Sequence, residues 1–203
     1  GAGNAERQLR KDGVGKTYDS TGWFKGPDGK MRKEIDPKKV TAALWDTVDW
    51  RSDPDMVSFN LTDVTDKVPE FAKYKGMFKG VRVHIGDPLR TRDGGGGQFD
   101  LGRKVVHIYA HLDNEHDLLR QVVWSAIHKA SYTKQRELLA DSNALPKEKR
   151  LPYLWRELHL SDIDSEVKSF IEDTFLHELQ HGIQDVEGFE NGGGLRTGAA
   201  AAA

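Results

Sequence analysis

The sequence contains no cysteine among its 203 residues. This excludes disulfide bonds, thiolate metal sites and cysteine nucleophiles, so any metal site must use histidine, aspartate, glutamate or water. The sequence also lacks an apolar run that approaches the roughly 20 residues of a membrane span. Because no signal-peptide hydrophobic region is present either, we expect a protein that is neither inserted in a membrane nor secreted through a signal peptide.

The chain has little excess charge of either sign. Its 30 Lys and Arg residues are offset by 32 Asp and Glu residues, which gives a formal net charge of −2. Two basic clusters, KGPDGKMRK and PKEKR, are short and are balanced by the acidic residues. We therefore expect no specific nucleic-acid partner and no attraction to an anionic membrane surface.

Hydrophobic periodicity predicts an α+β protein with a small β-sheet packed on helices. The turn sequence GPDG lies between two β-capable pieces and predicts a hairpin within residues 21–36. β-Branched residues predict strands at 81–85 and 104–112, and the glycine run 94–97 between them is typical of a flexible connector. The helices are expected at 37–50, 114–140, 146–158 and roughly 162–186.

One domain with an appended arm suits a chain of this length. Residues 1–36 are expected to form an N-terminal arm that carries the hairpin. Residues 37–197 are expected to form the main domain. Residues 198–203, a glycine followed by five alanines, are expected to be a tail or a tag.

The C-terminal part of the last expected helix contains the pentapeptide HELQH, residues 177–181. His177 and His181 share one helical face because they are four residues apart, so both imidazoles can bind one ion. Glu178 is rotated from them by about 100°, which suits it to take a proton from a water on that ion and not to be a ligand. This HExxH pattern is typical of zinc metallopeptidases, in which zinc lowers the pKa of the water.

The third metal ligand is less well defined by the sequence, although a catalytic zinc site uses three protein ligands and a water. In the metzincin spacing the third ligand follows the second histidine by six residues, and that position holds Glu187 here. Glu187 can reach the ion only if the helix breaks between Asp185 and Gly188, which the sequence EGFENGGG favours. We rank Glu187 first, Asp185 second and Glu190 third, and a ligand from beyond residue 198 stays open.

Other residues would complete a peptidase cleft above the HELQH helix. The strand at 104–112 is expected to form the upper rim of the cleft, where an extended peptide would pair with its edge. Tyr109 and His111 are candidates to stabilise the oxyanion, since both lie on this strand. The alternative interpretation of HELQH is an ordinary amphipathic helix that exposes two solvated histidines.

Two segments of the chain resemble a domain of phage and mobile-element proteins. They are STGWFKGPDGKMRKEID, residues 20–36, and LHELQHGIQDVEGFENGGG, residues 176–194. The domain occurs within large polyvalent proteins and next to phage head-morphogenesis modules. The resemblance implies a zincin-like fold with the HExxH motif on the long C-terminal helix, and a zinc metallopeptidase with His177 and His181 as ligands and Glu178 as the base. It also supports Glu187, which matches the glutamate of the family's EGF motif.

The chain departs from the family pattern at three places. Met31 stands where the family has tryptophan, and Gly182 stands where it has alanine. Residues 114–158 are longer than the usual link between the last strand and the HExxH helix. We expect them to be an insertion that covers the cleft or mediates assembly.

The HExxH motif predicts a zinc metallopeptidase with a peptide or protein substrate, and the resemblance implies that it is encoded by a phage. The implied partners are the rest of a larger phage polypeptide or virion proteins, and the expected location is the phage virion or the cytoplasm of the bacterial host. The alternative is a non-catalytic structural or ejected virion module whose metal site is structural or vacant. A fourth protein ligand in place of the water would distinguish a structural site from a catalytic one.

Overall fold

The computed structural model describes residues 23–25, 31–33, 35–86 and 96–187, and it describes side chains within 35–86 and 96–183. The chain divides into two compact units, Gly1–Ala42 and Ala43–Ala203. The boundary falls inside helix α3 (Pro37–Trp45). Each unit is therefore described by itself.

The first unit contains the predicted hairpin. Strands β1 (Trp23–Lys25) and β2 (Met31–Lys33) pair antiparallel, with Phe24 opposite Arg32. The turn between them lies outside the described residues. The strand pair confirms the prediction that was made from the GPDG turn signal.

Helix α3 is shorter than the predicted 37–50. Its first residue is Pro37, at a position where a helix needs no backbone N–H. The amides of Thr47 and Val48 both donate to the Leu44 carbonyl, each at 3.0 Å, and this turn ends the helix at Trp45. The expected extension to residue 50 is wrong because the chain forms this turn directly after Trp45.

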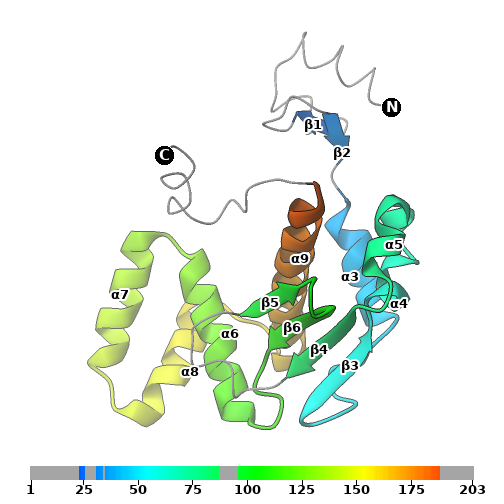
Figure 1. Cartoon of the computed structure of the whole chain (residues 1–203). Coiled ribbons are helices and arrows are strands. Elements are labelled where there is room, and N and C mark those ends of the chain that lie inside the picture. The colour runs from blue at the N-terminus through cyan, green and yellow to red at the C-terminus, as the bar shows by residue number, and fades with distance from the viewer. Residues whose placement is uncertain (1–22, 26–30, 34, 87–95, 188–203) are drawn as a thin grey trace, which may run out of the picture. The chain divides into compact units, whose positions relative to one another are not determined.

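The second unit is built on a mixed four-stranded sheet with the order β3-β4-β6-β5 (Figure 1). Strand β3 (Met56–Asn60) is antiparallel to β4 (Arg82–Gly86), which is parallel to β6 (Val105–Tyr109). Strand β5 (Gly97–Asp100) is antiparallel to β6 and forms one edge. The structure thus confirms strands near 81–85 and within 104–112, and it adds β3 and β5, which were not predicted.

The two faces of the sheet differ in polarity. Alternate residues of β3, β4 and β6 are buried, and they form an apolar face with Val57, Phe59, Val83, Ile85, Val106 and Ile108. The Phe59 ring lies 6.5 Å from the ring of Phe175 on the last helix, so this face packs on that helix. Paired residues form a polar row across the opposite face, namely Ser58, His84, His107 and Gln98. The α+β prediction is confirmed.

The segment between β3 and β4 adds a compact aromatic cluster. It contains α4 (Leu61–Thr65), the 3-10 helix η1 (Pro69–Tyr74) and α5 (Lys75–Phe78). Phe71 and Phe78 are fully buried and meet edge to face with centroids 5.9 Å apart. The Phe78 ring also lies 6.5 Å from the ring of Phe99 on β5. The cluster therefore supports the edge strand from one side.

Four helices complete the unit, and one sequence prediction about them is wrong. They are α6 (Glu115–Lys129), α7 (Tyr132–Asn143), α8 (Lys147–Glu157) and α9 (Ile163–Glu187). The single helix expected at 114–140 is two helices. Ala130 adopts an extended conformation, and the Ser131 hydroxyl accepts a hydrogen bond from the Lys134 amide, which starts a new helix. Helices α8 and α9 confirm the predictions for 146–158 and roughly 162–186.

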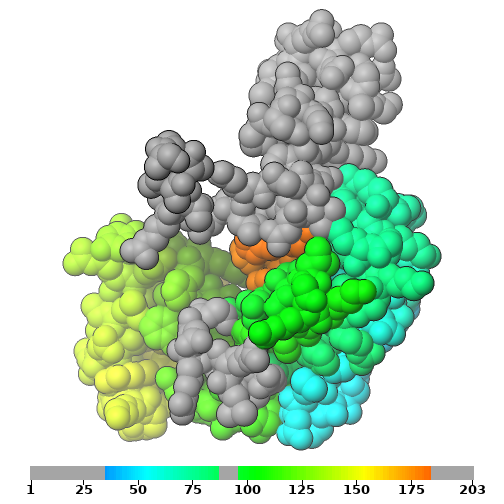
Figure 2. All heavy atoms as spheres, in the orientation of Figure 1, coloured from blue at the N-terminus to red at the C-terminus, as the bar shows by residue number. Residues whose placement is uncertain are grey.

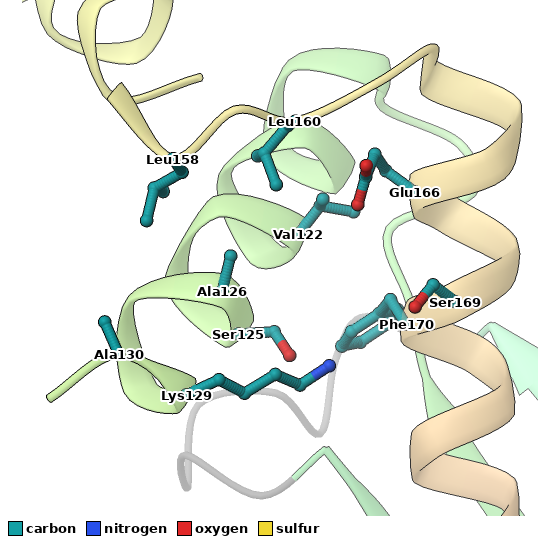
Figure 3. Close-up of a pocket in the computed structure, with 10 residues that line it drawn as sticks. All are labelled: Val122, Ser125, Ala126, Lys129, Ala130, Leu158, Leu160, Glu166, Ser169 and Phe170. Atoms are coloured by element: carbon teal, nitrogen blue, oxygen red, sulfur yellow. The ribbon is translucent and has the colours of Figure 1, made fainter. Parts of the chain in front are cut away.

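Helix α9 packs against β5, β6 and α6. Between α6 and the N-terminal half of α9 is a cavity of about 360 Å³ (Figure 3). Phe170 and Val122 line it, and Lys129 reaches across from α6 to form an ion pair with Asp173 of α9. No helix in the described part of the chain is long and apolar enough to cross a membrane.

The N-terminus of α9 is capped by Asp162. One carboxylate oxygen accepts the Ser165 amide at 2.9 Å, and the other accepts the Ser165 hydroxyl at 2.7 Å. These hydrogen bonds lower the pKa of Asp162, the amide having the larger effect. They stabilise the charged carboxylate at the positive end of the helix.

We predict that Asp162→Ala lowers the thermal unfolding temperature at neutral pH. Because the pKa of Asp162 is lower in the folded than in the unfolded chain, its stabilisation is present above the unfolded pKa of about 3.9 and is lost as pH falls through the folded pKa. Melting curves from neutral to acidic pH should therefore converge for wild type and variant below that range. In Asp162→Asn, which keeps a neutral cap, the loss should be smaller. A loss for Asp162→Ala that persists unchanged at acidic pH would contradict this role.

Candidate functional site

The imidazole rings of His177 and His181 in HELQH point their Nε2 atoms toward each other. Their Nε2 atoms are 2.9 Å apart, and their rings meet edge to face with centroids at 4.4 Å. This follows from the helix, since residues four apart stand above one another on one face. His177 is exposed and His181 is partly buried. Two imidazole nitrogens that converge in this way can share a proton or hold one cation.

Glu178 lies in a different environment from its neighbour His177. The helical rotation of about 100° per residue turns its side chain under the sheet, where only 6% of the residue is exposed. Burial raises the pKa of the Glu178 carboxyl above its usual value. The charges of His177 and His181, and a hydrogen bond from the Phe99 backbone amide, oppose this rise in the pKa. The motif thus places a buried carboxyl beside two solvent-accessible imidazoles.

Edge strand β5 approaches α9 unusually closely. A Cβ added to Gly97 would lie 2.7 Å from Cγ of Glu178, 2.9 Å from Cγ2 of Thr174 and 2.8 Å from the carbonyl oxygen of His107. A Cβ added to Gly182 of α9 would lie 2.6 Å from the Phe99 ring. Glycine at 97 and 182 therefore allows the strand to cover the HELQH part of the helix.

The free edge of β5 faces this region. The Tyr109 amide donates a hydrogen bond to the Gly96 carbonyl at 2.9 Å. In an antiparallel pair such as β5 and β6, hydrogen-bonded and non-hydrogen-bonded residue pairs alternate along the strands. In the observed register Gln98 therefore bonds to β6, while the backbone groups of Gly97 and Phe99 point away from it. The hydrogen bond from the Phe99 amide to Glu178 agrees with this direction. Figure 2 shows β5 and β6 at the surface, with the C-terminal part of α9 visible beside them.

The prediction that the strand at 104–112 forms the rim of the cleft is wrong. The strand expected at 104–112 is β6, which lies between β4 and β5 and has no free edge. The edge next to α9 is β5, which begins at Gly97 in the glycine run that was interpreted as a connector. The sequence signal that could have revealed β5 is QFD after that run, because it puts Phe99 between two polar residues.

The two oxyanion candidates are not brought to the motif. Tyr109 alternates with the buried Ile108, so its ring lies on the sheet face opposite α9, where it stacks 5.7 Å from His107 and donates its hydroxyl proton to Gln98. His111 follows the end of β6, and its amide bonds to Gln121 of α6. On the polar face, Nδ1 of His84 is 2.6 Å from the Ser58 hydroxyl. None of these contacts involves the HELQH residues.

The third ligand stays a prediction. The backbone of α9 is helical through Glu187, the last described residue of the helix, so the break that would bring Glu187 to the ion does not precede it. The side chains of Asp185 and Glu187, and all of Glu190, lie outside what the structure describes. Within the described residues, no three His, Asp or Glu side chains form a group that could hold a metal ion. The described residues therefore provide two converging imidazole nitrogens and no third ligand.

No protein-family model, no curated protein and no solved structure matches this chain.

We predict that Gly97→Ala destabilises the protein by about 1–3 kcal/mol, the usual range for an overpacked site. The added Cβ meets a backbone carbonyl and the stem of a buried glutamate, so the strand must move away from α9. Urea unfolding measures the effect. The matched control is Gly76→Ala in α5, where an added Cβ meets nothing within 4 Å. Equal stability of Gly97→Ala and wild type would show that β5 does not lie this close to Glu178.

Proposed function

We propose that this protein is a zinc-dependent metallopeptidase, with His177 and His181 as metal ligands and Glu178 as the general base. The observation that carries the proposal is the arrangement on α9, where two imidazole nitrogens 2.9 Å apart lie next to a buried carboxyl. A surface helix with two solvated histidines would give no reason for the glutamate between them to be buried under a sheet edge. The buried carboxyl supports a catalytic role for the motif.

The donor set fits zinc. Neutral imidazole is a preferred ligand of Zn²⁺, and a cysteine-free chain offers only nitrogen and oxygen donors. Two such ligands leave room for a carboxylate and a water. Glu187 is the carboxylate that we propose, with Asp185 and Glu190 as alternatives.

The chemistry assigned to Glu178 follows from its position and burial. Zinc would supply a polarised carbonyl and a water with a lowered pKa. A Glu178 carboxylate oxygen accepts the proton from the attacking water and then gives it to the leaving amine. Burial raises the pKa of this carboxyl, which makes its carboxylate a stronger base.

The substrate would pair with β5 and not with β6. The backbone groups of Gly97 point toward the free edge of β5, as does the carbonyl of Phe99. An extended peptide can add to such an edge through main-chain hydrogen bonds. This pairing would bring its scissile bond beside the HELQH face of α9.

We predict that the double substitution His177→Ala and His181→Ala abolishes stoichiometric zinc binding. Zinc content of the purified protein, measured by mass spectrometry after dialysis, provides the test. The control His116→Ala removes an exposed histidine of α6 and should leave zinc unchanged. Zinc retained by the double variant would place the metal elsewhere. Single alanine variants of Asp185, Glu187 and Glu190 identify the third ligand, and we expect Glu187→Ala to weaken zinc binding most.

We predict that Glu178→Gln keeps zinc and the fold but lowers peptide hydrolysis by about a hundredfold to ten-thousandfold, the usual contribution of a positioned general base. The amide preserves the shape and the contact with Phe99 but cannot accept the water proton. Cleavage of casein, and of the protein's own chain, is measured with and without a chelator. The control Glu137→Gln changes an exposed glutamate of α7.

Two outcomes would contradict the proposal in different ways. Loss of zinc in Glu178→Gln would make this residue a ligand and not a base. A zinc-loaded wild type that cleaves no peptide of a library would favour the non-catalytic virion module.

A further inference from the structure

Helices α6, α7 and α8 enclose a groove that the proposed peptidase site does not use. It has a volume of about 740 Å³ and lies away from the HELQH residues. Figure 1 shows the three helices side by side. Its apolar residues come from all three helices, and they are Val123, Trp124, Leu139, Leu151 and Leu154.

Helix α8 has an apolar side that nothing in the described chain buries fully. None of its residues is buried, although Leu151 and Leu154 are apolar and line the groove. On the opposite wall Trp124 of α6 is 46% exposed. A contiguous apolar surface with a polar rim is typical of an interaction site. The groove therefore has room and apolar surface for a further element.

The charge of the groove is opposite to that of the whole chain. Arg120, Lys147 and Arg150 line it against the single carboxylate of Glu148, whereas the chain carries a formal net charge of −2. Arg120 has a carboxylate partner, Asp117, at 3.6 Å. The Arg150 guanidinium donates to the carbonyls of Leu145 and Asn143. Within the described residues, neither Lys147 nor Arg150 forms an ion pair with a carboxylate.

We propose that this groove binds an acidic amphipathic segment of a partner protein. Apolar side chains of the segment would pack between Trp124, Leu151 and Leu154, and its carboxylates would meet Arg120, Lys147 and Arg150. An amphipathic helix in a groove is one recurring form of such recognition. A nucleic acid fits less well, because it offers phosphates but no apolar side chains for the floor of the groove, and Glu148 would repel it.

The test uses the full chain and three synthetic helical peptides that share one apolar pattern. Their remaining positions are glutamate, glutamine or lysine, and binding is followed by fluorescence anisotropy of labelled peptide. The glutamate peptide should bind most tightly, and salt should weaken its binding because charge contributes to it. Equal binding of the glutamate and glutamine peptides, tighter binding of a labelled oligonucleotide, or no binding of the glutamate peptide would overturn the proposal.

Variants with reversed charges test whether the glutamate peptide binds in the groove. Arg120→Glu and Lys147→Glu change exposed side chains. Each should lower the affinity for the glutamate peptide by about tenfold, which is a modest loss for one charged contact. Trp124→Ser should weaken it through loss of apolar contact. The matched control Arg136→Glu reverses an exposed charge on α7 outside the groove and should have no effect. An equal loss in Arg136→Glu would show a general effect of charge and overturn the assignment. Zinc content should be the same in all four variants.

Discussion

The close approach of β5 to α9 is the constraint on which the candidate site depends. At Gly97 and Gly182 the strand and the helix come so near that a methyl group on either residue would meet atoms at less than 3 Å. This approach buries Glu178 and brings its carboxylate to the outward amide of Phe99. The Phe99 ring is supported in turn by Phe78 of the aromatic cluster. The environment of one carboxyl thus depends on two glycines and a cluster that lies before β4 in the chain.

The same geometry divides the HELQH motif into two environments. One helical step of about 100° separates the exposed His177 from the buried Glu178. Burial raises the pKa of the carboxyl, whereas a divalent cation held by His177 and His181 would lower it again. In the proposed enzyme these two effects oppose each other. The metal would thus favour the charged carboxylate, while burial makes that carboxylate a stronger base.

Local patterns in the sequence predict part of the fold. The start of α9, the paired strands of the hairpin and the strands β4 and β6 follow from periodicity and turn signals that a few neighbouring residues carry. The break before Tyr132 was missed because apolar periodicity continues across it, while a single serine side chain starts the new helix. The segment from Met56 to Phe78 was not predicted because its short helices are stabilised by buried aromatic contacts and not by periodicity.

The order of strands in the sheet is the part of the site that local patterns do not contain. β6 has the stronger strand signal, so it was expected to be the rim, but strong β-branched content is also what a central strand requires. β5 is four residues long and begins with glycine, as suits an edge that must fit over Glu178. A residue with a side chain at position 97 would give a better strand signal and a worse site. The position that weakened the strand prediction is therefore the one that lets the strand cover the proposed base.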